Sequence, residues 1–164
     1  MNTGSQPRPD GAQQKRFLIN IVSDTVAALA GDGADATELP LHKASVAAAV
    51  YHYSIGVLGS QEIAGLLPTD PAFGLWCQNG VPSAADIARV RDEQGEILRR
   101  GLIDALGWAW NVPLRSVVTG MPTQAYAQKV TAGRNQQFNS QADVEAEADK
   151  RIAAAAAADV GTAS

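Results

Sequence analysis

The sequence contains only one cysteine and two histidines, so thiol chemistry and Cys/His metal sites have few residues to draw on. Its single cysteine, Cys77, cannot form an internal disulfide, and no Cys-x-x-Cys or Cys/His cluster is present to bind zinc. Cys77 follows Trp76 in an apolar stretch without a nearby Lys or His, which favours an inert buried thiol over a nucleophile. His42 and His52 are interpreted as structural or surface residues. The glycine-rich run GDGAD, residues 31–35, lacks the lysine of a phosphate-binding loop. We therefore predict no catalytic residue, no metal, no cofactor and no enzyme activity.

Long apolar runs are also missing. No stretch approaches the roughly 20 apolar residues that a membrane-spanning helix needs. The N-terminal residues MNTGSQPRPDGAQQKR lack the charged-then-apolar order of a secretion signal. We expect no membrane association and a cytoplasmic location.

Basic residues are outnumbered, with 13 Lys and Arg against 17 Asp and Glu and a net charge of −4. This balance argues against a generally basic nucleic-acid-binding protein. The charge is uneven, however, because residues 83–134 hold seven basic and five acidic side chains. Any phosphate contact is therefore expected in this segment.

Aromatic residues make up only 5% of the chain, so a few large side chains must supply much of the buried area. Residues on the predicted inner faces of the helices form the expected core: Phe17, Val50, Tyr51, Ile63, Leu67, Phe73, Trp76, Ile87, Val90 and Ile97.

The apolar spacing throughout the chain is helical, which predicts an all-α fold: a compact multi-helix bundle with terminal arms. Residues 1–12 are rich in Gly, Pro and Gln and are predicted to be a disordered arm. Residues 13–134 are the predicted helical domain. Residues 135–164 form an alanine-rich, acidic tail that is helical by propensity or frayed. Because the tail has almost no large apolar residue, we expect it to be an exposed helix or frayed, and we expect residues 1–12 and 141–164 to be dispensable for folding.

A helix-turn-helix-like corner is predicted in GSQEIAGLLPTDPAFGLWCQNG, residues 59–80. Ser60 can cap a first short helix, which Pro68 ends, and Asp70-Pro71 can begin a second that runs to Gln78. The second helix carries no Lys or Arg, whereas the reading of base edges usually needs Arg, Lys, Asn or Gln in the first turns. We therefore interpret it as part of the core.

The longest predicted helix begins after Ser83, which forms a capping-box pattern with Asp86, and extends to Pro113. It carries four arginines. If it is continuous, Arg89 and Arg100 lie within about 20° of each other around its axis. Arg91 then points elsewhere, toward a structural carboxylate such as Asp70 or Glu62, and Arg99 bridges the two faces. The helix is either a solvated face of mixed charge or a phosphate-binding surface. The candidate DNA-binding residues are Arg89, Arg99 and Arg100.

Residues 39 to about 100 resemble the N-terminal helical domain of bacterial insertion-sequence transposases of the DDE class. The matching residues are Tyr51, Gly56, Ser60, Glu62-Ile63, Asp70, Ala72-Phe73, Trp76 (one place displaced), Gly80, Pro82, Ile87 and Arg91. Val90 replaces the Phe that usually precedes the arginine. The resemblance covers roughly 60 of the 164 residues.

In the resembling family, this region helps to bind transposon DNA or to dimerise. A catalytic domain whose three carboxylates hold two divalent metals follows it there, and we expect that no such domain fits in this sequence. The resemblance thus implies a transposase-derived, non-catalytic module that binds or regulates DNA. The alternative is a helical assembly or adaptor protein, for example a phage structural component, located in the virion. The partner is accordingly DNA or a protein, with a homo-oligomer as a further option.

Overall fold

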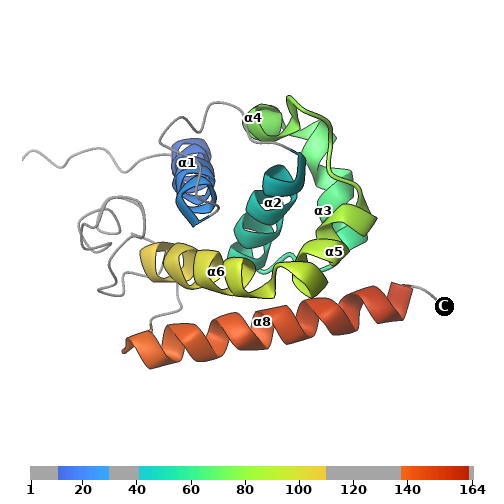
Figure 1. Cartoon of the computed structure of the whole chain (residues 1–164). Helices are drawn as coiled ribbons and strands as arrows, with labels where there is room; N and C mark the ends of the chain where they lie inside the picture. The colour runs from blue at the N-terminus through green and yellow to red at the C-terminus, as the bar shows by residue number, and fades with distance from the viewer. Residues whose placement is uncertain (1–10, 30–40, 110–137, 163–164) are drawn as a thin grey trace, which may run out of the picture.

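The computed structural model describes residues 11–29, 41–109 and 138–162, and these residues form an all-α bundle without strands (Figure 1). The elements are α1 (Gly11–Leu29), α2 (Leu41–Ile55), α3 (Ser60–Leu66), the 3₁₀ turns η1 (Leu67–Thr69) and η2 (Pro71–Phe73), α4 (Gly74–Cys77), α5 (Ala84–Glu93), α6 (Gly95–Ala109) and α8 (Gln141–Thr162). The predicted fold class is therefore confirmed. Of the predicted N-terminal arm, residues 1–10 lie outside the described residues and the last two begin α1. The predicted boundary at residue 134 also lies outside them.

Helix α2 is the centre of the bundle and contacts each of the other α-helices (Figure 1). Its buried apolar residues are mostly small: Ala44, Val46, Ala47, Ala48, Ala49 and Val50. Small side chains allow helix axes to approach closely. Gly101 of α6 shows how close the approach is, because a Cβ atom there would lie 3.0 Å from Cγ2 of Val50.

An aromatic cluster fixes the corner of the bundle onto α2. The rings of Phe73 and Trp76 stack with centroids 5.3 Å apart, and Tyr51 meets both rings edge-on. The indole N–H of Trp76 donates to the hydroxyl of Ser23, which in turn donates to the carbonyl of Ile19 at 2.9 Å. The buried Trp76 therefore has a polar partner on α1 and joins the corner to that helix.

Most of the predicted core is confirmed. Eight of the ten predicted residues are buried: Val50, Tyr51, Ile63, Leu67, Phe73, Trp76, Ile87 and Val90. Ile97 is only half-buried, and the side chain of Phe17 lies outside the described residues.

The second helix of the predicted corner differs from expectation. Residues 71–78 do not form one helix: Pro71–Phe73 are a 3₁₀ turn, and only Gly74–Cys77 are α-helical. Asp70 begins the turn as predicted, since its carboxylate accepts a hydrogen bond from the backbone N–H of Ala72 at 2.9 Å. Four helical residues with Trp76 buried among them cannot act as a recognition helix.

The predicted long helix is two helices, α5 and α6. Its start is correct, because Ser83 and Asp86 form a complete capping box. The helix breaks at Gln94, whose φ of −126° and ψ of 31° are not helical, and Gly95 then begins α6. The angle calculated for Arg89 and Arg100 on a continuous helix therefore does not apply.

The C-terminal tail was expected to be exposed, and this expectation is wrong. Residues 141–162 form α8, which lies along α6 and also contacts α2, α3 and α5 (Figure 1). Its own residues Val144, Ala148 and Ala155 are fully buried on the face that packs against the bundle. Contacts of small residues with a nearby helix leave no large apolar signal in the sequence, so propensity predicted the helix but not its packing.

Polar contacts at both ends of the α2–α3 turn hold α8 in place. Arg151 donates from Nη1 to the carbonyls of Tyr53 and Ser54, each at 2.7 Å, in the last turn of α2. Asp159 accepts from the backbone N–H of Ser60 at 2.8 Å and from its hydroxyl at 2.6 Å, where α3 begins. A cation thus lies at a helix C-terminus and an anion at a helix N-terminus, as the helix dipoles favour. Helix α8 is part of the domain.

The aromatic cluster predicts a large stability loss on truncation. Phe73→Ala or Trp76→Ala should each lower the free energy of unfolding by about 3–5 kcal/mol, because each removes a fully buried ring and leaves a cavity. Urea unfolding followed by circular dichroism measures this loss. Leu75→Ala, at a half-buried position between them, is the control and should cost less. Losses below about 1 kcal/mol at both rings would contradict the assigned core.

Candidate nucleic-acid interface

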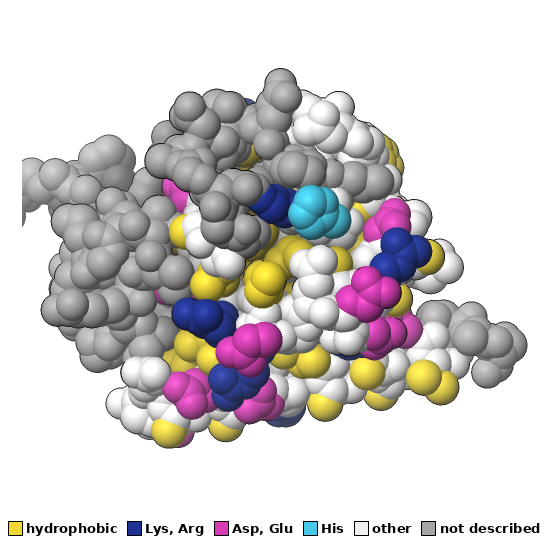
Figure 2. Space-filling view, in the orientation of Figure 1, with side chains coloured by type: hydrophobic (Ala, Val, Ile, Leu, Met, Phe, Trp, Pro, Cys, Tyr) yellow, Lys and Arg dark blue, Asp and Glu magenta, His cyan; other side chains and the backbone are white. Residues whose placement is uncertain are grey.

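The four arginines of α5 and α6 lie in different environments. Figure 2 shows basic side chains on the visible face of α5, α6 and α8, most of them with acidic side chains beside them. The two helices together hold four arginines and five carboxylates: Asp86, Asp92, Glu93, Glu96 and Asp104. Three further basic residues of the segment predicted to be positive, Arg115, Lys129 and Arg134, lie outside the described residues. The described part of this segment is therefore not net positive.

Arg91 is held in the structure and is not available to a ligand. Only 11% of its side chain is exposed, and its Nη1 donates to Oδ2 of Asp159 at 2.7 Å. Burial alone would raise the pKa of Asp159, but hydrogen bonds from Ser60 and Arg91 outweigh burial and lower this pKa. The prediction that Arg91 pairs with a structural carboxylate is confirmed, although the carboxylate is not one of the two predicted.

The predicted partners of Arg91 were nevertheless wrong. Asp70 pairs with Lys15 of α1 instead, and no described contact joins Glu62 to Arg91. The actual partner, Asp159, lies 68 positions away on α8. Asp159 belongs to the segment that the sequence predicts to be exposed, so spacing along the chain gives no reason to pair it with Arg91.

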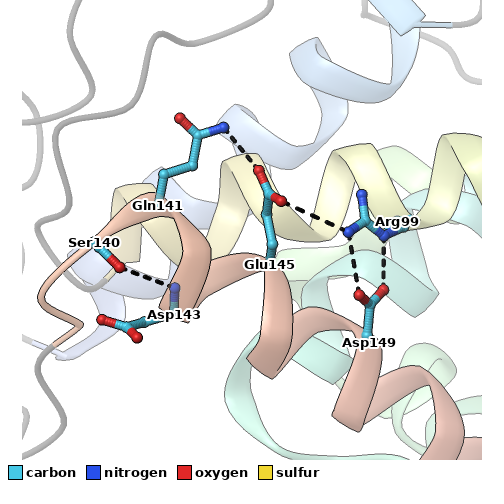
Figure 3. A network of polar contacts seen from close by, with 6 residues as sticks. All are labelled: Arg99, Ser140, Gln141, Asp143, Glu145 and Asp149. Atoms are coloured by element: carbon cyan, nitrogen blue, oxygen red, sulfur yellow. Dashed lines mark hydrogen bonds and ion pairs between the residues drawn. The ribbon is translucent and has the colours of Figure 1, made fainter.

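Arg99 forms a bidentate ion pair at the surface with Asp149 of α8 (Figure 3). Its Nε donates to Oδ1 of Asp149 at 2.7 Å and its Nη2 to Oδ2 at 3.1 Å, while Glu145 lies 3.9 Å from Nη2. About 33% of the Arg99 side chain and 55% of the Asp149 side chain remain exposed. The hydrogen bond from Arg99 lowers the pKa of Asp149. Gln141 donates to Glu145 at 2.8 Å, so this acid too is held near the arginine.

Arg89 and Arg100 are the most accessible of the four. The Arg89 side chain is 59% exposed and lies 3.6 Å from Asp86, whose carboxylate already serves the capping box. Arg100 is exposed and forms no ion pair with the described helices. Arg89 also lines a groove of about 330 Å³ between α5 and the start of α2, where His42 is its neighbour. These two guanidinium groups can reach an external anion without breaking a close contact.

The two histidines and the cysteine have structural or surface positions. His52 is buried, its Nδ1 lies 2.8 Å from the carbonyl of Ala48, and burial lowers its pKa to about 4, so the ring is neutral near pH 7. His42 is exposed. Cys77 is half-buried rather than buried, and burial raises the pKa of its thiol, which opposes reactivity. Across the described residues, no three His, Cys, Asp or Glu side chains are grouped to hold a metal ion.

A second cleft, of about 440 Å³, was not expected from the sequence. Its floor is formed by Tyr51, His52 and Phe73, and Ile55 and Leu66 stand at its edge with 37% and 38% of their surface exposed. The Lys15–Asp70 ion pair closes one side, and the Lys15 ammonium lies 4.9 Å from the centre of the Phe73 ring. Residues from α1, α2 and η2 meet here, a combination that spacing along the chain could not reveal.

Comparisons with protein-family models, curated proteins and solved structures gave no match. Within the part of the chain that the structure describes, no helix is both long and apolar enough to cross a membrane. The resemblance to transposase domains therefore rests on the residues quoted above.

The structure gives several of those residues a role in the fold. Gly56 and Gly80 have φ angles of 92° and 115°, which other residues rarely adopt. Asp70 caps η2, Ser60 binds Asp159, and Arg91 binds the same carboxylate. These shared positions specify a helical scaffold and turn geometry, and they do not themselves form a DNA-binding surface.

The Arg91–Asp159 pair predicts a selective effect on stability. Arg91→Ala should lower the free energy of unfolding by about 1.5–3 kcal/mol, because it leaves a largely buried carboxylate without its charged donor. Arg89→Ala, the control, should change it by less than about 0.5 kcal/mol. Equal effects in thermal or urea unfolding would contradict the structural role of Arg91.

The same pair has a defined pH dependence. Because the folded state lowers the pKa of Asp159, its contribution is complete above the ordinary value of 3.8 and is lost as the pH falls through the lower folded value. The stability difference between wild type and Arg91→Ala should therefore shrink on acidification.

Proposed function

We propose that this chain is a non-catalytic helical module that binds DNA weakly and with little sequence preference, as its resemblance to transposase N-terminal domains implies. The observation that carries the proposal is the separation of the arginines into two kinds. Arg91 is enclosed and paired with α8, whereas Arg89 and Arg100 present exposed guanidinium groups on consecutive helices. Guanidinium groups of this kind bind phosphate oxygens well.

Two features favour contact with the DNA backbone over the reading of bases. The corner at residues 60–77 lacks a recognition helix, since its second helix is four residues long and contains the buried Trp76. Acidic side chains also lie close to the arginines, so the local field is weakly attractive at best. An affinity in the range of nonspecific binding, about 10⁻⁴–10⁻⁶ M at physiological salt, is expected.

Removing both accessible arginines tests the proposal. Arg89→Ala combined with Arg100→Ala should weaken binding to the same extent for unrelated duplex sequences. It should also flatten the dependence of log affinity on log salt by about two, because two phosphate contacts are lost. Fluorescence anisotropy with labelled duplexes at several salt concentrations measures both quantities.

Arg16→Ala is the control for lost positive charge, since Arg16 is exposed on α1. It should leave the salt slope nearly unchanged. If wild-type protein retains no DNA even at about 50 mM salt, where such contacts are strong, the DNA function is wrong.

A second candidate function, a helical assembly or adaptor protein, is favoured by the aromatic-floored cleft. Ile55 and Leu66 flank the cleft and are two of the four large apolar residues exposed among the described ones. A partner that inserts an apolar side chain into this cleft would cover Ile55 and Leu66. A second copy of this chain is the partner to test first, because its concentration can be controlled directly.

Self-association through the cleft should be insensitive to salt and sensitive to charge at its edge. Ile55→Asp combined with Leu66→Asp should convert an oligomer into monomers in sedimentation-velocity experiments. Val160→Asp, at a position 75% exposed on α8, is the matched control and should not do so. A monomeric wild-type protein at high concentration would argue against self-assembly.

A further inference from the structure

The contacts of α8 with the arginines differ between its two halves. Near its C-terminus, Asp159 is only 17% exposed and accepts hydrogen bonds from the Ser60 N–H, the Ser60 hydroxyl and Arg91. In its N-terminal half, Glu145 and Asp149 approach Arg99 at the surface. The first contact anchors the helix, whereas the second adds little to its attachment because exposed ion pairs contribute little to stability.

The geometry at Arg99 is the geometry that a phosphate group would adopt. Two parallel N–H donors, Nε and Nη2, bind the two oxygens of the Asp149 carboxylate at 2.7 and 3.1 Å (Figure 3). A phosphate uses the same pair of donors on arginine. Asp149 and a DNA phosphate therefore cannot occupy these two donors together.

We infer that the acidic side chains of α8 compete with DNA phosphate for Arg99 and so set the affinity of the interface, an inference that rests on the DNA-binding function proposed above. Asp149 is exposed enough to leave Arg99 by rotation of its side chain, while Asp159 and Arg151 keep the helix docked. Once displaced, Asp149 and Glu145 remain beside the arginine and repel an approaching phosphate. Arg99 therefore contributes little to DNA binding in the wild-type chain.

Neutralising the two acids should release this competition. Glu145→Gln with Asp149→Asn is expected to strengthen duplex DNA binding by about threefold to tenfold at low salt and to steepen the salt slope by about one, since one phosphate contact is gained. The control, Glu62→Gln with Asp24→Asn, removes the same charge at exposed positions on α3 and α1. A gain no larger than in this control would overturn the inference.

A double-mutant comparison assigns the effect to Arg99. Arg99→Ala should weaken binding only slightly in the wild-type chain, and less than Arg100→Ala does. In the Glu145→Gln, Asp149→Asn background, it should remove the gained affinity. Equal losses in the two backgrounds, or a wild-type loss as large as that of Arg100→Ala, would contradict competition at Arg99.

The comparison of Arg99→Ala with Arg100→Ala needs no change in α8, so it remains informative if the double neutralisation disturbs packing. These results also separate the two proposals. If Arg89→Ala with Arg100→Ala leaves DNA binding intact, the proposed interface is wrong. If that variant weakens binding but neutralisation of the α8 acids does nothing beyond its control, only the competition is wrong.

Discussion

The carboxylate of Asp159 is the contact on which the arrangement of the C-terminal half depends. It satisfies the first backbone N–H of α3, accepts from the Ser60 hydroxyl and binds Arg91 of α5, so three helices converge on one side chain. An anion at this place is favoured by the unpaired N–H groups and by the dipole of the helix that begins there. Arg151, eight positions earlier on α8, satisfies carbonyls at the end of α2. One helix thus completes both sides of the turn between α2 and α3.

Local signals in the sequence were sufficient for the features that depend on local interactions. The Ser83–Asp86 capping box and the buried positions Ile63, Phe73 and Trp76 follow from spacing and side-chain type, and the structure has them as predicted. The break at Gln94 was missed because the following Gly95 weakens a helix but does not by itself end one. The packing of α8 was missed for another reason: it depends on alanines and on contacts across as many as 99 positions, for which periodicity carries no information.

The candidate interface was predictable only in part, and the arginines show why. Helical angles separated Arg91 from Arg89 and Arg100, and the structure also places it apart, but the angles could not name Asp159 as its partner. They could not foresee Asp149 beside Arg99 either, since both carboxylates come from the segment interpreted as an exposed tail. The aromatic-floored cleft could not be predicted from the sequence either, because Lys15 and Asp70 come together only when the helices pack. Sites assembled from distant segments of the chain can be predicted only when the fold is known.

The two ion pairs of α8 show how similar chemistry can serve different ends. Arg91 and Asp159 are largely desolvated and share further hydrogen bonds, so an incoming phosphate would have to leave a buried carboxylate uncompensated. Arg99 and Asp149 lie at the surface with 33% and 55% of their side chains exposed, so one anion can replace another there at small net cost. Burial, rather than residue type, therefore decides which arginine belongs to the scaffold and which can exchange partners. Arg91, the arginine in the resemblance to transposase domains, therefore belongs to the scaffold, and the proposed DNA contact depends on the acids placed around the remaining arginines.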